Sequence, residues 1–293
     1  MKRIAFASGK GGAGKTSLSL SFHAYMHSRS VFVDCDVDAA DAFLLIEKEK
    51  TAHFEFVSGV KYSIVAEQCV QCGACAERCV FHAISPEGGY HIEPLHCEGC
   101  GACLDVCPAG AVVETPNRCG DMYSATTCYD SAMWYARLIP GEDNSGKLVH
   151  DIRKKAQDYT EKAELPYLVI DCPPGIGCPL MASITAVDLL VVVIESSRSG
   201  FHDAQRLIEL AQKMNISCVA LINKAGINQV IDTEIERYCA DAHICCVGTI
   251  PFNREFTSLL NKKQVVFESE TMASLMTPMF QAIEQIALEG GKK

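Results

Sequence analysis

The chain has 293 residues, 48% of them hydrophobic, and a formal net charge of −10. This length accommodates one α/β domain of roughly 240 residues with an insert of roughly 55, and the apolar content is enough for a sizeable core. The acidic balance argues against nonspecific binding to nucleic acid or to an anionic membrane surface. Because 17 cysteines occur without a secretion signal, we expect a reducing, cytoplasmic location. The longest strongly apolar run, residues 189–194, is far too short for a stable membrane anchor.

Strands and helices are expected to alternate along the chain, which predicts an α/β fold with a mainly parallel, doubly wound sheet. The first strand is expected at residues 2–7, with a helix following from Thr16 to about residue 27. The other strands are expected at 30–34, 167–171, 188–195, 218–223 and 246–250, and the other helices at 146–161, 201–214, 231–239 and 271–289. The closing helix carries few basic residues, so we expect it to dock on the core and not to bind a membrane.

A phosphate-binding loop follows the first expected strand directly. Its pattern is G-x4-G-K-T, formed by Gly9, Lys10, Gly11, Gly12, Ala13, Gly14, Lys15 and Thr16. The backbone N–H groups of such a loop converge on phosphate oxygens, and the N-terminus of the following helix adds positive charge. Lys15 is expected to reach the β- and γ-phosphates of ATP, and the Thr16 hydroxyl to bind Mg²⁺. The order of strand, loop and helix argues against a chance glycine-rich turn.

Two copies of a four-cysteine pattern, C-x2-C-x2-C-x3-C, begin 28 residues apart. Three thiolates at this spacing can hold three corners of an iron–sulfur cube, and in two-cluster ferredoxins the fourth cysteine ligates the other cluster. The expected ligand sets are therefore crossed. One [4Fe–4S] cluster is expected on Cys69, Cys72, Cys75 and Cys107, and the second on Cys79, Cys97, Cys100 and Cys103.

Zinc is the alternative for these cysteines. Zinc usually takes two separated C-x2-C pairs, which would leave the third cysteine of each copy unused. A disulfide framework is less consistent with a chain that has no mark of secretion. We call each four-cysteine pattern a comb. We expect both combs to lie in an inserted α+β ferredoxin domain at residues 61–115, between ATPase parts at 1–60 and 116–293. Two clusters would stabilise so small a unit.

The segment Lys10–Thr16 resembles the deviant phosphate loop of the MinD/ParA/nitrogenase-iron-protein class of P-loop ATPases. Residues 31–36 look like the second strand and first switch of that family, and residues 168–175 like its Walker B strand and second switch. The segments that contain Asn223 and Pro251 match those that frame the adenine in relatives. The resemblance covers nearly the whole chain, and the nearest match is the MinD-like ATPases with an inserted ferredoxin domain.

This resemblance implies roles for individual residues. In the family, the extra lysine, here Lys10, reaches across a dimer interface to the nucleotide of the partner. Asp36 would orient the attacking water, while Asp34 and Asp171 would hold the hydration shell of Mg²⁺. We therefore expect an ATP-dependent homodimer, or a heterodimer with a paralogous ATPase. Three further acidic residues are interpreted as loop residues without a role in the site: Asp38, Asp41 and Glu195.

Cys178 lies seven positions after Asp171, where the nitrogenase iron protein has a cysteine that ligates a cluster shared across the dimer. The loop that supplies a second cysteine in that protein resembles residues 144–146 here, which contain none. A bridging cluster at Cys178 would lack ligands unless Cys119 or Cys128 substitutes for the missing one. A plain thiol in a mobile switch is the simpler interpretation of Cys178.

Three function classes are compatible with the sequence. The first is an ATP-dependent redox protein, in which nucleotide turnover controls electron delivery from two clusters to a partner protein. The second is an ATPase that assembles iron–sulfur or other metal clusters on a client protein. The third is a positioning ATPase of the septum or plasmid type, which eight ligand cysteines make the least favoured. A partner for either of the first two classes is not named by the sequence.

Overall fold

The computed structural model describes residues 1–290. They form two compact units, each assembled from separate stretches of the chain. Unit 1 contains Met1–Phe54, Met122–Arg137 and the residues from Ser145 onwards, and unit 2 contains Glu55–Asp121 and Leu138–Asn144. The expected insert at 61–115 lies inside unit 2, which extends beyond it at both ends and also takes in residues 138–144. The last three residues of the expected segment 116–293 lie outside the described residues.

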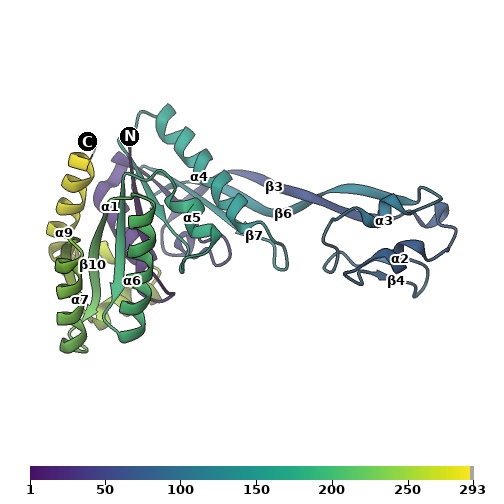
Figure 1. Ribbon diagram of the computed structural model, residues 1–293. Coiled ribbons are helices and arrows are strands. Elements are labelled where there is room, and N and C mark those ends of the chain that lie inside the picture. The colour runs from purple at the N-terminus through teal and green to yellow at the C-terminus, as the bar shows by residue number, and fades with distance from the viewer. Residues whose placement is uncertain (291–293) are drawn as a thin grey trace. The chain divides into compact units, whose positions relative to one another are not determined.

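The main sheet has nine strands in the order β11-β10-β9-β1-β8-β2-β7-β6-β3 (Figure 1). Every neighbouring pair from β11 to β7 is parallel, which confirms the expected mainly parallel α/β sheet. The strands are β1 (Lys2–Ala7), β2 (Ser30–Asp34), β3 (Lys48–Ile64), β6 (Val112–Thr127), β7 (Ala132–Leu138), β8 (Tyr167–Asp171), β9 (Leu189–Glu195), β10 (Cys218–Ala225) and β11 (Cys245–Pro251).

Helices cover both faces of the sheet in unit 1 (Figure 1). One face is covered by α1 (Lys15–Met26) and α9 (Glu270–Glu289). The other is covered by α4 (Ser145–Lys162), α5 (Cys178–Ile184), α6 (Arg198–Lys213) and α7 (Gln229–Asp241), and the short α8 (Arg254–Asn261) follows β11. In the part of the chain that the structure describes, no helix is long and apolar enough to cross a membrane.

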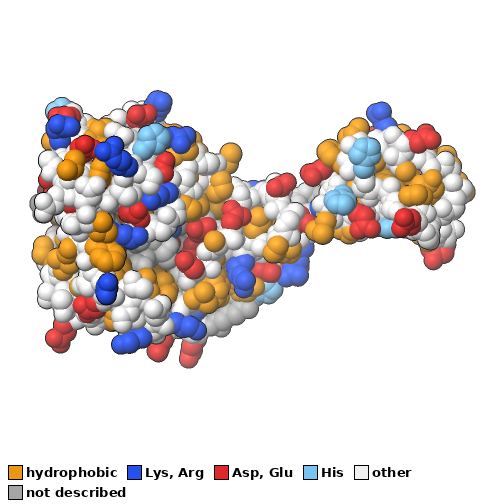
Figure 2. All heavy atoms as spheres, turned by 90° about the horizontal axis from the view of Figure 1, so that it is seen from below, with side chains coloured by type: hydrophobic (Ala, Val, Ile, Leu, Met, Phe, Trp, Pro, Cys, Tyr) orange, Lys and Arg blue, Asp and Glu red, His pale blue; other side chains and the backbone are white. Residues whose placement is uncertain are grey.

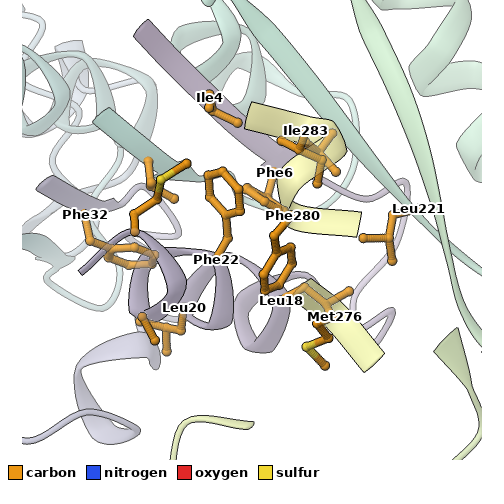
Figure 3. Close-up of a cluster of buried hydrophobic side chains, with 14 of the residues drawn as sticks. Ile4, Phe6, Leu18, Leu20, Phe22, Phe32, Leu221, Met276, Phe280 and Ile283 are labelled. Atoms are coloured by element: carbon orange, nitrogen blue, oxygen red, sulfur yellow. The ribbon is translucent and has the colours of Figure 1, made fainter. Parts of the chain in front are cut away.

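The core between β1, α1 and α9 consists of large side chains that are withdrawn from water (Figure 3). Ile4 and Phe6 alternate along β1 and meet Phe22 of α1, whose ring lies edge-on to Phe280 of α9 at 5.3 Å between centroids. Each such side chain contributes about 1.5–3 kcal/mol by burial. The complete burial of Phe280 and Ile283 confirms that the closing helix docks on the core.

The strands β3, β6 and β7 and the helices α5 and α8 are not predicted by the sequence analysis. β6 contains Pro116, Asn117 and Gly120, residue types that are depleted in strands, so its sequence does not indicate one. β3 runs through the expected domain boundary after residue 60, and β6 runs through the one after residue 115. These boundaries therefore mark the limits of the cysteine-bearing segment and not the ends of the strands.

Unit 2 contains two similar halves, in keeping with the duplicated cysteine pattern. The short helices α2 (Ala74–Arg78) and α3 (Ala102–Asp105) each follow a glycine, Gly73 or Gly101, with the same left-handed backbone of φ 78° and ψ −7°. A Cβ atom on Gly73 would lie 2.8 Å from the hydroxyl of Tyr90, and one on Gly101 would lie 3.1 Å from that of Tyr62. The strands β4 (Ile84–Ser85) and β5 (His91–Ile92) pair antiparallel beside these helices.

His23 is a fully buried polar residue on α1. Its Nδ1 atom lies 2.8 Å from the Ser30 hydroxyl and its Nε2 atom 2.9 Å from the Ser131 hydroxyl. Burial, with a smaller contribution from His27, lowers the pKa of His23 from 6.5 to about 3. The folded protein therefore keeps this imidazole neutral at pH values where the unfolded chain protonates it.

The stability of unit 1 should consequently fall as the pH drops from about 6.5 towards 3, because the unfolded state then binds a proton that the folded state excludes. The loss should approach about 1.4 kcal/mol per pH unit. Urea unfolding can be followed by the fluorescence of Trp134, the only tryptophan of the chain, which belongs to unit 1. His23→Gln should remove this part of the pH dependence, whereas the exposed His150→Gln should not. If the free energy of unfolding depended equally steeply on pH in the wild type and in His23→Gln, the assignment would be contradicted.

Candidate functional site

The phosphate-binding loop connects β1 to α1 and is shaped by glycines in left-handed conformations. Gly12 has φ 82° and Gly14 has φ 90°, and residues other than glycine rarely adopt this region of backbone conformation. A Cβ atom on Gly14 would lie 2.3 Å from the Asn223 amide nitrogen. Glycine is therefore required at this position both by the backbone conformation and by the neighbouring side chain.

Lys15, the first residue of α1, is almost completely buried beneath the loop. Its ammonium lies 2.8 Å from the Asp171 carboxylate and donates a hydrogen bond to the Thr16 hydroxyl at 3.1 Å. Burial disfavours the charged ammonium, but Asp171 and Asp34 outweigh it and raise the pKa of Lys15. The lysine is thus held as a cation at the start of the helix, as a phosphate-binding role requires.

Two carboxylates face this ammonium from the ends of adjacent strands. Asp34 on β2 and Asp171 on β8 are register partners, and both are fully buried. Asp171 accepts from the Ser19 hydroxyl at 3.0 Å through Oδ1, while its buried Oδ2 has no hydrogen-bond partner among the described residues. Burial, followed by the charge of Asp171, raises the pKa of Asp34 well above its ordinary value. An orphaned carboxylate oxygen in a site with excess negative charge fits Mg²⁺, which prefers oxygen ligands.

Asp36 and Asp41 lie in the loop that follows β2. The backbone N–H of Asp36 donates to Asp34, and burial raises the pKa of the half-buried Asp36 carboxyl. Asp41 is exposed, but it also accepts a hydrogen bond from the Thr16 hydroxyl. The exposure of both Asp38 and Asp41 agrees with their interpretation as residues of a solvated acidic loop, and the hydrogen bond adds a contact between Asp41 and the start of α1.

Asn223 and Pro251 line a common cavity of about 190 Å³ beside the loop, together with Phe252 and Phe256. The Asn223 amide nitrogen donates to the Ala13 carbonyl at 2.8 Å, and its amide oxygen accepts from the Lys224 backbone at 2.9 Å. Asn223 therefore ties the phosphate-binding loop to the end of β10. A cavity with aromatic walls next to this loop has the character of a site for a planar base.

Glu195, at the end of β9, contacts this site, although the sequence analysis interprets it as a loop residue without a role there. It forms ion pairs with Lys10 at 2.7 Å and with Lys224 at 2.9 Å. Burial alone would raise the pKa of Glu195, but hydrogen bonds from Lys10, Lys224 and Ser197 together lower it to about 2. The position could have been found from topology, since the carboxyl ends of parallel strands form the binding edge of such a sheet.

The exposed Cys178 begins α5, directly after the segment that resembles a second switch. A Cβ atom on Gly146 of α4 would lie 3.6 Å from the Cβ atom of Cys178, so the starts of the two helices are in contact. Arg153 of α4 donates to the carbonyls of Ala182 and Thr185 at the other end of α5. α4 thus holds α5 at both ends.

The eight comb cysteines of unit 2 line two small cavities of equal size, each about 20 Å³. Three members of one comb and the last member of the other contribute to each cavity. The first is lined by Cys79, Cys97, Cys100 and Cys103, and the second by Cys69, Cys72, Cys75 and Cys107. Among the described residues, no three Cys, His, Asp or Glu side chains converge closely enough to hold a single metal ion.

The backbone donates equivalent hydrogen bonds to one cysteine in each of the two cavities. The N–H of Ala83 donates to the Cys79 sulfur at 3.4 Å, and the N–H of Ala111 donates to the Cys107 sulfur at 3.3 Å. Donors of this kind favour the thiolate form of a cysteine, and the pKa of Cys107 is lowered chiefly by the Ala111 hydrogen bond. The fourth cysteine of the second comb, Cys107, is therefore prepared to act as an anionic ligand.

Cys119 and Cys128 line neither of these two cavities. Cys119 is fully buried in unit 2 and donates a hydrogen bond to the Ser58 carbonyl at 3.1 Å, while Cys128 is exposed in unit 1. The structure thus gives neither cysteine a place beside the comb cysteines.

Comparison with known proteins places this arrangement among nucleotide-binding proteins. The family described as the CobQ/CobB/MinD/ParA nucleotide binding domain matches residues 4–266. The uncharacterized protein MJ0578 of Methanocaldococcus jannaschii is 33% identical over 275 residues, which are 93% of this chain and 92% of that protein. The uncharacterized ATP-binding protein MJ0547 of the same organism is 22% identical over 252 residues, covering 85% of this chain and 73% of that protein.

Solved structures share the fold at low sequence identity. The MinD cell division protein of Aquifex aeolicus superimposes with a TM-score of 0.56 at 14% identity, covering 97% of this chain and 98% of that chain. The septum site-determining protein MinD of Pyrococcus horikoshii, complexed with Mg-ADP, gives a TM-score of 0.58 at 13% identity, covering 100% and 99% of the two chains. Similarity at this level of identity establishes a common fold.

The geometry of the loop leads to a test with two substitutions. Lys15→Ala should abolish nucleotide binding, because it removes the buried cation beneath the loop and leaves Asp34 and Asp171 unopposed. Asp36→Ala should retain binding and lose hydrolysis. Calorimetric titration with ATP and Mg²⁺, together with phosphate release, measures both effects, and the exposed Lys213→Ala is the matched control. Wild-type turnover by Asp36→Ala would refute its water-orienting role.

Proposed function

Because the chain belongs to the CobQ/CobB/MinD/ParA nucleotide-binding family, we propose that it is a magnesium-dependent ATPase that controls electron transfer through two [4Fe–4S] clusters. The observation that carries this proposal is the pair of crossed four-cysteine cavities within a chain of that family. Two copies of the chain, or one copy and a paralogue, would assemble around ATP, with Lys10 of each reaching the nucleotide of the other.

The ATPase part of the proposal is supported by the charges of the site. Lys15 and the backbone of the glycine loop would bind the phosphates, while Thr16, Asp34 and Asp171 would hold Mg²⁺ and its water. Asp36, in the loop after β2, would orient the attacking water. Gly11, Gly12, Ala13 and Gly14 would bind the phosphates through backbone N–H groups, and the cavity lined by Asn223 and Pro251 would accept the adenine.

The cluster part of the proposal is supported by the fit of the donor set. Each cavity offers four thiols around a common space. Cys69, Cys72, Cys75 and Cys107 would ligate one cluster, and Cys79, Cys97, Cys100 and Cys103 the other. Such clusters would supply one-electron chemistry at potentials set by their surroundings.

The coupling part is supported by the way the chain passes between its two units. The chain passes from one unit to the other after residues 54, 121, 137 and 144. The first three of these points lie inside β3, β6 and β7, and the fourth is at the start of α4. In unit 2, Lys61 donates to the carbonyl of the cavity residue Cys97 at 2.9 Å and pairs with Glu142 at 3.5 Å. Glu142 lies three residues before the start of α4. α4 is the helix that contacts both ends of α5, which follows the second switch.

Unit 2 also concentrates the negative charge of the protein. It contains 11 of the 36 Asp and Glu residues but only three of the 26 Lys and Arg residues. Figure 2 shows acidic and apolar side chains together on the visible face of this unit. This distribution favours a basic partner protein over nucleic acid.

An ATPase that assembles metal clusters on a client protein is the second candidate. It is favoured by the exposed thiol of Cys178, which stands at the start of α5 beside the second switch and could hold a metal in transit. A cargo cluster would leave the protein during ATP turnover, whereas a resident cluster would remain bound. Iron retained after many turnovers therefore supports the redox function, and stoichiometric loss to a chelator supports assembly.

Anaerobically purified protein should contain about eight iron and eight sulfide per chain. Ser substitutions test the crossed ligand sets by electron paramagnetic resonance of the reduced protein. Cys79→Ser and Cys100→Ser should perturb the same cluster signal, while Cys107→Ser and Cys72→Ser should perturb the other. The buried Cys119→Ser is the matched control and should leave both signals intact. One zinc per comb without sulfide, or a pairing within each comb, would contradict the assignment.

Coupling predicts that ATP affinity depends on the oxidation state of the clusters. The dissociation constant of ATP should differ about fivefold or more between dithionite-reduced and oxidised protein. Lys61→Ala should diminish this ratio, because it removes the link between the Cys97 carbonyl and Glu142. Calorimetric titration in both redox states measures the ratio. Equal ATP dissociation constants for reduced and oxidised wild-type protein would mean that unit 2 has no influence on ATP binding.

A further inference from the structure

Arg153 of α4 carries a buried charge that the nucleotide site described above does not use. The residue is only 8% exposed. Its Nη1 atom donates to the Ala182 carbonyl at 2.8 Å, and its Nη2 atom donates to the Thr185 carbonyl. These carbonyls lie at the C-terminal end of α5, where the helix dipole favours a cation. Two groups of the guanidinium are therefore engaged in holding α5.

The remaining group of this guanidinium has a different environment. Its buried Nε atom has no hydrogen-bond partner among the described residues, and an unpaired buried donor is costly and calls for an explanation. Two thiols act on the same charge. Burial lowers the pKa of Arg153, and the nearby Cys35 and Cys172 thiols oppose this change. The guanidinium thus has these two cysteines as neighbours in addition to the end of α5.

Cys35 and Cys172 directly follow the two aspartates of the nucleotide site. Asp34 and Asp171 are register partners, and the Cys35 N–H donates to the Asp171 carbonyl at 2.9 Å, which continues the pairing of β2 with β8. Successive side chains of a strand point to opposite faces of the sheet. Because Asp171 pairs with Lys15 on the α1 face, the two fully buried cysteines face α4 and α5. One buried cation therefore lies on each side of these strand ends.

The end of β2 also contacts α5 directly. The Cys35 thiol lies against the Ser183 hydroxyl of α5, and this hydroxyl donates to the Pro179 carbonyl at 2.8 Å. Asp36 follows Cys35 in the segment that resembles the first switch, and the segment that resembles the second switch continues from Cys172. A shift of either cysteine would therefore displace the start of a switch segment.

We propose that Arg153 is a positioning residue for ATP hydrolysis, which holds the ends of β2 and β8 against α4 and α5 and thereby fixes both switch segments. The step to hydrolysis rests on the proposed function, whereas the holding of the strand ends is a property of the single chain. α4 begins directly after the chain returns from unit 2. A displacement of this helix would therefore reach both switch segments through Arg153.

Three substitutions separate this role from a merely structural one. Arg153→Met keeps much of the length of the side chain and removes its contacts with α5 and with the thiols. Cys35→Ala and Cys172→Ala each remove one thiol and leave Arg153 paired with the α5 carbonyls. The matched controls are the exposed Arg206→Met on α6 and the buried Cys239→Ala on α7.

The first measurement needs no nucleotide. Hydrogen exchange of the full-length chain, followed by mass spectrometry, reports on the switch segments themselves. Arg153→Met should accelerate exchange in residues 35–41 and 175–178 about tenfold, because these segments lose their support from α4. The two cysteine variants should accelerate the same segments to a smaller extent and leave α5 unchanged, and the controls should behave like wild type. Acceleration by Arg153→Met that is confined to α5 would overturn the proposal.

The second measurement is the kinetics of ATP hydrolysis. Arg153→Met should lower kcat about tenfold or more and leave KM within about twofold, because it displaces the groups that orient the attacking water and not those that bind phosphate. Combined with Cys172→Ala, it should lower kcat by less than the product of the two separate effects, since both act through one contact. A raised KM with unchanged kcat, or fully multiplicative effects, would overturn the proposal.

Two further outcomes are also decisive. If Arg153→Met does not fold, the two cysteine variants carry both measurements, and an unchanged kcat in both of them would overturn the proposal. Wild-type protein that does not hydrolyse ATP would contradict the proposed function alone, since the hydrogen-exchange result stands without it.

Discussion

The buried ion pair between Lys15 and Asp171 is the contact on which the nucleotide site depends. It joins the helix after β1 to the carboxyl end of β8, and Asp34 and Asp36 surround the same ammonium. One cation cannot balance these carboxylates, and one oxygen of Asp171 has no partner among the described residues. Breaking a buried pair of this kind costs about 3–5 kcal/mol. On the proposed function, this site would gain a metal cation, and phosphate oxygens would replace the carboxylate contacts of Lys15.

Lys10, the other lysine of the loop, lies in a different environment. Lys15 is buried beneath the loop and pairs with Asp171, whereas Lys10 is partly exposed and pairs with Glu195. Glu195 pairs with both Lys10 and Lys224, and Lys224 also donates to the Gly12 carbonyl, so the loop and its two outer lysines share one counter-ion.

The sequence predicts those features that depend on local pattern. Buried parallel strands read as continuous apolar runs, so β1, β2 and β8 are located correctly. The cysteine spacing predicts the crossed sets that line the two cavities. The long strands β3 and β6 escape prediction because polar residues, Gly59 and Pro116 obscure their alternation. Glu195 escapes because its two partners lie 185 residues before it and 29 residues after it, and only the strand order brings them together.

The central claim is that nucleotide binding in unit 1 and cluster chemistry in unit 2 are energetically linked. The most direct measurement is a redox titration of the clusters, followed by electron paramagnetic resonance, with and without a bound non-hydrolysable ATP analogue. Linkage of about 1–3 kcal/mol should shift a midpoint potential by about 40–130 mV, because each tenfold change in affinity corresponds to about 59 mV for one electron. Midpoint potentials that stay unchanged, while the analogue is demonstrably bound, would contradict the account.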